Sequence, residues 1–319
     1  MMKVYVSEPI HPQAIAMLKE HFEVVQGKDL NRITEEAQGC SAILLRSIQI
    51  TAEMMDAIPT LKVIAKHGMG VDNIDVNHAT EKGILVVNAP YSNMNAVAEH
   101  IVMLLLALSK RAVQMDRLTR QGQFSQRTAY KTTELKNATL GIIGMGKISR
   151  LVVKKLSGFE MNILASDPYV KQSDVAELPV TMVSSEEVYR QSDFVIVHTS
   201  LFPSTFHLVS TERLRMMKPT AYLINAARGA IVDEAALVEA LQDGRIAGAG
   251  LDVFEQEPPA ADNPLFAMEN TVFSPHNAAL SDGALRAMAM DSAQGIIEYL
   301  TGKPVSYPVN PAVLGERHG

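Results

Sequence analysis

Cysteine is nearly absent from this chain, which contains only Cys40 among 319 residues. A single cysteine excludes an intramolecular disulfide, which fits a protein of a reducing compartment. We interpret Cys40 as a small buried apolar residue before a strand rather than as a reactive thiol. We expect no signal peptide at the N-terminus, because its strand-length apolar run meets Pro9 at once. We therefore expect a cytoplasmic protein.

Long apolar runs and an excess of positive charge are also missing. The longest apolar helical candidate, Ile101 to Leu108, is far too short to span a bilayer. The formal net charge of -6 provides no electrostatic footprint for nucleic acid. Hydrophobic residues at 47% and charged residues at 20% are typical of an ordinary globular protein. We expect neither a membrane nor a nucleic acid as partner, and the length favours two domains.

Short β-branched runs alternate with helical patterns from the start of the chain. A helix is predicted over residues 12–21, and strands are predicted at 4–6, 22–25, 42–45, 61–65 and 85–87. Strand–helix alternation with nearly continuous apolar strands indicates an α/β fold, in which helices cover both faces of a parallel sheet.

The alternation breaks at Asn95, where one long helical pattern runs to about Arg120. We expect this helix to carry the chain from the first domain into the second. Its apolar stretch from Val97 to Leu108 is more than one domain surface would usually expose, so it predicts burial between domains or subunits and a two-fold homodimer. The polar residues 122–134 are predicted to form a surface loop.

A second alternating series begins at Ala138. Its last helical pattern, at 283–300, is expected to return to the first domain. The earlier helices are predicted at 147–158 and 233–243, and the strands at 139–143, 161–166, 193–197, 221–225, 248–251 and 271–273. Six strands with helices between them are typical of a dinucleotide-binding sheet.

A glycine-rich turn follows the predicted strand at 139–143. Residues Gly144 to Ser149 form the phosphate-binding fingerprint, with Ser149 at the position of its third glycine. Gly144 permits a tight turn, Gly146 lets the backbone approach a pyrophosphate, and serine is small enough for close helix–strand packing. The next helix offers N–H groups and the positive end of its dipole to phosphates.

Asp167 ends the next predicted strand, where an acidic residue can accept hydrogen bonds from both ribose hydroxyls. A carboxylate there would repel a 2′-phosphate, so we predict NAD rather than NADP as cofactor. The alternative is an aspartate that only caps the turn before Pro168.

Several motifs resemble those of the D-isomer-specific 2-hydroxyacid dehydrogenase family. The N-x-x-R-G-x-x-V-D-x-x-A-L pattern spans Asn225 to Leu237, the D-V-x-x-x-E-P pattern spans Asp252 to Pro258, and the S/T-P-H pattern spans Ser274 to His276. Together with the glycine-rich turn and the loop Lys66 to Asp75, they cover nearly the whole chain in the family's order.

The resemblance implies two doubly wound parallel-sheet domains, a Rossmann domain at residues 99–284 inserted into a flavodoxin-like substrate domain at 1–98 and 285–319. It implies Arg228, Glu257 and His276 as the catalytic residues, and a substrate carboxylate on the Gly68, Met69 and Gly70 loop. The implied NAD-binding residues are Gly144, Gly146, Lys147, Ile148, Asp167, His198, Thr199, Ala226, Arg228, Asp252 and His276. No metal site is predicted.

The chemistry of a 2-keto acid explains these three residue types. Hydride transfer leaves negative charge on the carbonyl oxygen, and histidine is the side chain that can deliver a proton near neutral pH. Glu257 would orient His276 and favour its charged form. Arg228 is a permanent cation suited to a carboxylate and to the keto oxygen. Taken alone, a histidine after Ser-Pro would be interpreted as a turn residue.

The sequence departs from the family's pattern at three places. Ala96 stands where many relatives have Ser or Thr, and Ser200 replaces the proline of the usual His-x-Pro-Leu loop. Asn277-Ala278-Ala279 follows His276 where many relatives have Ile-Gly-Gly. The pocket beside His276 is therefore expected to differ in shape.

The substrate depends on two basic residues, Arg46 and Lys66, which end two strands of the first domain. Relatives acting on 3-phosphoglycerate carry basic residues at both places, whereas hydroxypyruvate, glyoxylate and D-lactate need fewer. The alternative is that both residues are solvated strand ends. No C-terminal regulatory domain is expected. An NAD-sensing protein that resembles the family's transcriptional corepressors is the alternative to a dehydrogenase.

Overall fold

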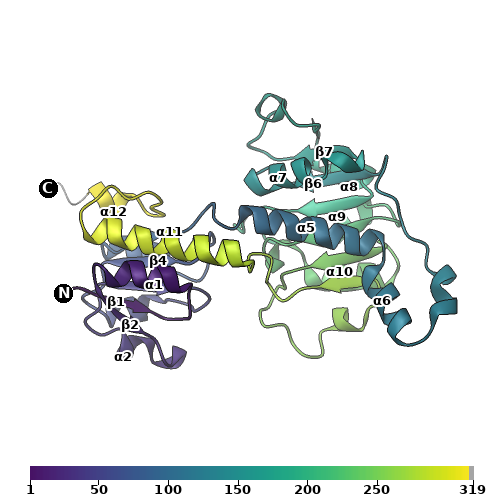
Figure 1. Cartoon of the computed structure of the whole chain (residues 1–319). Coiled ribbons are helices and arrows are strands. Elements are labelled where there is room, and N and C mark those ends of the chain that lie inside the picture. The colour runs from purple at the N-terminus through teal and green to yellow at the C-terminus, as the bar shows by residue number, and fades with distance from the viewer. Residues whose placement is uncertain (316–319) are drawn as a thin grey trace. The chain divides into compact units, whose positions relative to one another are not determined.

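The computed structural model describes residues 1–315 and divides the chain into two compact units. The first unit comprises Met1–Asn93 and the residues from Leu280 onward, and the second comprises Met94–Ala279 (Figure 1). The boundaries expected from the sequence, at 98 and 284, fall inside helices α5 (Met94–Ser109) and α11 (Asp282–Leu300). A helix is one rigid element, so the units divide just before each of these helices.

The first unit contains a five-stranded parallel sheet in the order β2-β1-β3-β4-β5. This is the flavodoxin-like strand order, in which the direction of winding reverses between β1 and β3. The strands lie close to the predicted ones: β1 (Lys3–Val6), β2 (Glu23–Gln26), β3 (Ala42–Leu45), β4 (Val63–Lys66) and β5 (Leu85–Val87).

Helices cover both faces of this sheet, as predicted. Val4 and Val6 pack with α1 (Pro12–Lys19) and α11 in one core cluster, and Figure 1 shows these two helices side by side. Tyr5 and Cys40 lie in the core on the other face, which confirms that Cys40 is buried. The helices of that face are α2 (Ile33–Glu36), α3 (Ala52–Asp56) and α4 (Val76–Glu81).

The last described segment closes the open edge of this sheet. Pro308 forms an antiparallel bridge with Val87 of β5. Asn310, just before α12 (Ala312–Gly315), is buried, and its Oδ1 accepts the Val86 N–H at 2.7 Å. Covering an edge in this way removes unpaired backbone groups that would otherwise invite another strand.

The second unit contains a seven-stranded parallel sheet in the order β12-β11-β10-β9-β6-β7-β8. The order reverses between β6 and β9, which is where such sheets bind ligands. Six strands agree with prediction: β6 (Thr139–Ile143), β7 (Asn162–Ser166), β9 (Phe194–Val197), β10 (Tyr222–Asn225), β11 (Gly248–Leu251) and β12 (Thr271–Phe273). The seventh, β8 (Thr181–Met182), was not predicted, because two edge residues carry no readable periodicity.

Five helices sandwich the second sheet. One face is covered by α5 and α7 (Lys147–Lys155), and the other by α8 (Ser185–Gln191), α9 (Thr211–Met216) and α10 (Glu234–Gln242). α7 is shorter than predicted, because a 3-10 turn over Ser157–Phe159 ends it. Within residues 1–315, no helix combines the length and apolar character needed to cross a membrane.

The single long helix predicted from Asn95 to Arg120 is wrong. α5 ends at Ser109, and α6 (Ala112–Arg120) starts after Arg111, whose φ of 49° is left-handed. A left-handed L-residue interrupts a helix, and the Arg111 Nε donates to Lys131 O at 3.1 Å, which holds the bend. Periodicity is unchanged across such a break, so the sequence pattern does not reveal it.

The apolar stretch of α5 is also buried differently from the prediction. Its residues from Val97 to Leu108 that point inward pack on α7 and on strands β10 to β12 of their own unit. Gly250 in β11 explains the close fit, because a Cβ there would lie 3.1 Å from the Leu108 side chain. This stretch therefore covers the sheet of its own unit rather than forming an exposed surface.

Candidate active site

The glycine-rich turn joins β6 to α7 in the second unit. Gly144 has a φ of 93°, and a Cβ there would overlap the carbonyl oxygen of His198. Gly146 caps α7 and has open space where a side chain would be. Ser149 is buried, and its hydroxyl donates to Gly144 O at 2.6 Å. The serine thus closes the turn with a hydrogen bond that a third glycine could not make.

Asp167 lies at the end of β7, beside this turn. Its Oδ2 accepts the Met145 N–H and its Oδ1 accepts the Tyr169 N–H, both at 2.8 Å. The carboxylate therefore does cap the turn before Pro168, and it also fixes the glycine-rich turn. Each carboxylate oxygen accepts more than one hydrogen bond, so this role leaves capacity for the ribose hydroxyls.

Two buried polar atoms lie where the strand order reverses. Among residues 1–315, His198 Nδ1 and Thr199 Oγ1, just after β9, have no hydrogen-bond partner. Burial and the nearby charge of Arg228 lower the pKa of His198 to about 4, so its imidazole is neutral at physiological pH. Buried polar atoms in native proteins are nearly always paired. The orphan atoms and the open space at Gly146 fit a bound dinucleotide.

The loop after β10 presents Arg228. Asn225 is buried, its Oδ1 accepts the Ala227 N–H at 3.0 Å and its Nδ2 donates to Arg228 O at 2.8 Å. The guanidinium donates to Ala227 O at 2.7 Å. Ala226, also buried, begins this turn. The asparagine of the N-x-x-R-G pattern therefore shapes the turn from which the arginine projects.

Gly229 allows the loops after β10 and β11 to touch. A Cβ at Gly229 would overlap the carbonyl group of Phe254 and the amide nitrogen of Glu255. The Phe254 N–H in turn donates to Glu257 Oε1 at 3.0 Å. Backbone contact at Gly229 thus sets the loop of Arg228 against the loop of Glu257.

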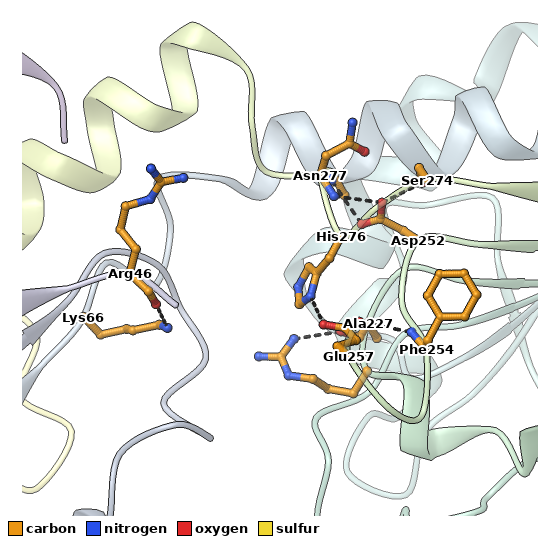
Figure 2. A network of polar contacts seen from close by, with 11 residues as sticks. Arg46, Lys66, Ala227, Asp252, Phe254, Glu257, Ser274, His276 and Asn277 are labelled. Atoms are coloured by element: carbon orange, nitrogen blue, oxygen red, sulfur yellow. Dashed lines mark hydrogen bonds and ion pairs between the residues drawn. The ribbon is translucent and has the colours of Figure 1, made fainter. Parts of the chain in front are cut away.

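Glu257 and His276 form the close pair at the centre of Figure 2. His276 Nδ1 lies 2.6 Å from Glu257 Oε2. Burial alone would raise the pKa of Glu257, but hydrogen bonds from His276 and from the Phe254 N–H hold it below its ordinary value. The carboxylate therefore stays charged, and His276 is held with Nδ1 toward it.

Asp252 is almost completely buried behind His276, at 1% exposure. Its carboxylate accepts the Ser274 hydroxyl at 2.6 Å and the N–H groups of Asn277 and Ala278 at 3.0 Å each (Figure 2). Burial opposes ionisation, but these hydrogen bonds and the contact with His100 Nε2 at 3.3 Å lower the pKa of Asp252. The resemblance implied Asp252 as an NAD-binding residue, and its oxygens here hold the loop of His276.

The first unit holds Arg46 and Lys66, which are predicted to bind substrate. Lys66 Nζ donates to Arg46 O and, at 2.9 Å, to Asn73 Oδ1. The Arg46 guanidinium donates to Pro9 O at 3.1 Å, and Glu8 accepts the Arg46 N–H at 2.7 Å. Lys66 thus joins neighbouring loops, which reduces its availability for a substrate phosphate.

The loop after β4 has the backbone expected of a glycine-dependent turn. Gly68 has a φ of 139°, and Met69 is 38% exposed with Gly70 beside it. The Asn88 side chain donates to Met69 O at 2.7 Å. Met69 and Gly70 therefore lie in a held, partly exposed loop that fits the predicted carboxylate contact.

Sequence reasoning missed His100 on α5. Its Nε2 lies 2.7 Å from Ser274 Oγ, in the loop of His276. The available signal was a histidine beside the apolar positions Val97 and Ile101 of α5. In the described part of the chain, no group of three or more His, Cys, Asp and Glu residues could hold a metal.

Two buried histidines predict a pH-dependent stability. Burial, with the charges of Arg46 and Lys66, lowers the pKa of His67 to about 4 from a usual 6.5, as burial does for His198. Between these values the unfolded chain binds more protons than the folded one, so the free energy of unfolding falls as the pH is lowered from 6.5 to 4. Each histidine contributes at most about 1.4 kcal/mol per pH unit.

Urea unfolding of His67→Gln at several pH values between 7 and 4 should therefore give a shallower pH slope than the wild type. The exposed His21→Gln is the matched control and should leave the slope unchanged. Equal slopes for the wild type and His67→Gln would contradict this prediction.

Comparison with known proteins agrees with this geometry. Residues 102–278 match the family model described as the D-isomer specific 2-hydroxyacid dehydrogenase NAD binding domain. A D-3-phosphoglycerate dehydrogenase of Archaeoglobus fulgidus is 39% identical over 97% of this chain, and the chain spans 59% of that protein. A glyoxylate reductase of Thermococcus onnurineus is 37% identical over 99% of this chain and 98% of its own length.

A solved structure has the same fold. The NADPH-dependent glyoxylate/hydroxypyruvate reductase of Sinorhizobium meliloti, in complex with NADP and malonate, superposes with a TM-score of 0.86 at 30% identity. The superposition covers 98% of this chain and 97% of that one. The α/β fold predicted from the sequence is thereby confirmed.

Proposed function

Because the chain belongs to the D-isomer specific 2-hydroxyacid dehydrogenase family, we propose that it interconverts a D-2-hydroxy acid and its 2-keto acid with NAD. The observation that carries this proposal is the 2.6 Å contact between His276 and Glu257 at the carboxyl ends of a Rossmann sheet. A proton donor paired with a charged carboxylate is what reduction of a keto group requires.

Each catalytic side chain has a distinct proposed role. The bound nicotinamide would supply the hydride for reduction of the keto acid. Glu257 holds Nδ1 of His276, so the proton that moves is the one on Nε2. The charged Glu257 stabilises the imidazolium before this proton leaves. Arg228 polarises the keto oxygen and pairs with the substrate carboxylate, which a planar cation does in bidentate fashion. In the oxidation direction, His276 takes the hydroxyl proton.

For the substrate, we favour a small unphosphorylated 2-keto acid such as glyoxylate or hydroxypyruvate. The bonds of Lys66 to Arg46 O and Asn73 support this choice, because they engage two of the three N–H groups of the second cation expected for a phosphate. The guanidinium of Arg46 keeps 3-phosphoglycerate as the second candidate.

Absorbance of NADH with a substrate panel tests the proposed function. Glyoxylate, hydroxypyruvate and pyruvate are assayed for NADH consumption, and 3-phosphoglycerate for NADH formation. We expect turnover with the first two, and higher kcat/KM for them than for 3-phosphoglycerate. Tight NADH binding without turnover of any of these acids would contradict a dehydrogenase and favour an NAD-sensing binding protein.

Cofactor choice should depend on the charge of Asp167. Asp167→Asn keeps an oxygen for the Met145 N–H but removes the charge that repels a 2′-phosphate. We expect the Kd for NADPH to fall about tenfold relative to that for NADH, which is about 1.4 kcal/mol. Fluorescence titration with both cofactors measures this. Asp174→Asn, on an exposed turn of the same unit, is the control. If wild-type protein binds NADPH more tightly than NADH, the NAD assignment fails.

We also propose a homodimer, on a basis that differs from the one expected at first. The inward face of α5 is buried in its own unit, but Met103, Val113 and Phe124 are 42%, 51% and 64% exposed on α5, α6 and the 3-10 helix that follows them. Exposed apolar side chains on three consecutive segments favour association. Sedimentation at micromolar concentration should give a dimer mass, and Phe124→Ser should weaken it. A monomer mass for the wild type would contradict the proposal.

A cytoplasmic location is likewise proposed. It is supported by the buried, unpaired Cys40, which fits a reducing compartment. Fractionation of cells that produce the full chain tests it.

A further inference from the structure

His100 points from α5 toward the loop that carries His276. The side chain of His100 is only 13% exposed. Its Nε2 lies 2.7 Å from Ser274 Oγ and 3.3 Å from Asp252 Oδ1. Both partners lie at the ends of strands that α5 packs against, β12 and β11. The contact therefore joins a rigid helix to the loop after β12.

The positions of two protons in this group follow from its geometry. Ser274 has one hydroxyl proton, and its Oγ lies 2.6 Å from a carboxylate oxygen of Asp252, which can only accept. Ser274 therefore donates to Asp252 and accepts from His100, so His100 Nε2 carries a proton. In this orientation His100 cannot act as a base for Ser274, which excludes a nucleophilic role for the serine. The chain of hydrogen bonds runs one way, from His100 through Ser274 to Asp252, and such chains reinforce one another.

Asp252 links this series of hydrogen bonds to the backbone of His276. Its carboxylate accepts the N–H groups of Asn277 and Ala278, and its backbone oxygen accepts the His276 N–H at 2.7 Å. His276 itself has a φ of 50°, a left-handed conformation that L-residues disfavour. Hydrogen bonds to Asp252 thus hold the backbone at His276 and at the two residues after it. The Asp252 carboxylate also accepts the hydroxyl of Ser274, and His100 fixes that serine.

We propose that His100 is a positioning residue for His276. Its Nε2–H donates a hydrogen bond to Ser274, and Ser274 in turn fixes the carboxylate of Asp252. Asp252 fixes the backbone of His276 so that Nδ1 meets Glu257. The inference rests on the proposed function, because it assigns a purpose to the geometry of the proton donor. Loss of a catalytic group's position by about 1 Å can cost about 100-fold in rate, so loosening this loop reduces kcat while the cofactor and substrate contacts remain.

Three single variants, one double variant and a matched control test this role. We expect His100→Ala to lower kcat by about 10- to 100-fold, with KM and the Kd for NADH within about twofold of wild type. His100→Gln should restore most of kcat, because its amide N–H lies at nearly the place of Nε2. Ser274→Ala should lower kcat about as much as His100→Ala. The kcat of the double variant should be no lower than that of the more impaired single variant, since both residues act through the same series of hydrogen bonds. The control is His78→Ala, because the Nε2 of His78 also bonds a carboxylate, that of Asp56, at 3.0 Å.

A spectroscopic readout separates this inference from the proposed function. The proton between His276 Nδ1 and Glu257 should give a downfield NMR signal in the wild type, in His100→Gln and in His78→Ala, and exchange should broaden it in His100→Ala. This signal requires no turnover, so an inactive wild type would contradict the proposed function and leave the positioning measurable. An intact signal and wild-type kcat in His100→Ala would overturn the inference. So would a folded His100→Gln that is as impaired as His100→Ala, because the donated proton would then not matter.

Discussion

Replacement of His276 by glutamine should lower kcat by about three orders of magnitude, within the range that a positioned general acid contributes. Glutamine has nearly the size of histidine, and its amide N–H lies at nearly the place of Nε2, the atom that would donate the proton. It cannot release a proton to a developing alkoxide, and it lacks the Nδ1–H that bonds Glu257, so the proton-transfer step is lost. Steady-state turnover of the best keto acid in the panel measures kcat, and fluorescence titration measures the Kd for NADH, which should change by less than about twofold.

His207 provides a closely matched control for this substitution. It also bonds a glutamate, with Nε2 2.8 Å from Glu255 Oε1, and its φ of 49° is nearly that of His276. His207→Gln therefore tests what the same change does in the same backbone conformation beside the same type of partner. A kcat of His276→Gln near that of His207→Gln would remove His276 from the role of acid.

The strand-end loops could be predicted from the sequence because their signals are local. The glycine-rich turn, the N-x-x-R-G pattern and the Ser-Pro-His segment each follow a short apolar strand, and in a parallel sheet such ends meet at one edge. The structure brings Glu257 and His276 together there. The positions of these residues at strand ends were sufficient for this prediction, because a parallel sheet places the ends of its strands side by side.

The features that sequence reasoning missed depend on contacts between distant segments. Nothing local to Arg111 predicts that it bonds Lys131 and ends a helix. Lys66 looked like a free cation at a strand end, whereas Asn73 and the carbonyl of Arg46 receive its N–H groups. His100 lies 174 residues from Ser274 in sequence. Periodicity and motif spacing contain no information about partners of this kind.

For Asp252, the motif identified a residue of the site correctly, but the role implied for it was incomplete. The D-V-x-x-x-E-P pattern marks it, and the resemblance implies a cofactor contact. The structure adds that its buried carboxylate is engaged with Ser274, Asn277 and Ala278. A substitution of Asp252 would therefore disturb the position of His276 as well as any cofactor contact, so it cannot separate the two roles.

Gly229→Ala should have the largest effect of any single-methyl change in the second unit. The new Cβ would overlap the backbone of Phe254 and Glu255, which cannot move aside as the end of a side chain can. Overpacking of this kind costs about 1–3 kcal/mol of unfolding free energy. Arg228 precedes the glycine, and Phe254 donates to Glu257, so separating the loops moves both catalytic groups. We expect kcat/KM to fall at least about 100-fold, since displacements near 1 Å have that effect.

Urea unfolding and steady-state kinetics measure the two consequences of Gly229→Ala separately. Gly158→Ala is the control, because a Cβ there meets no atom of the described residues within 4 Å. It should leave both quantities unchanged. A folded Gly229→Ala protein with kcat/KM within about twofold of wild type would show that the loop contact does not set the distance between Arg228 and Glu257. Loss of activity with little loss of stability would instead support it most directly, because the methyl group would then act on catalytic geometry alone.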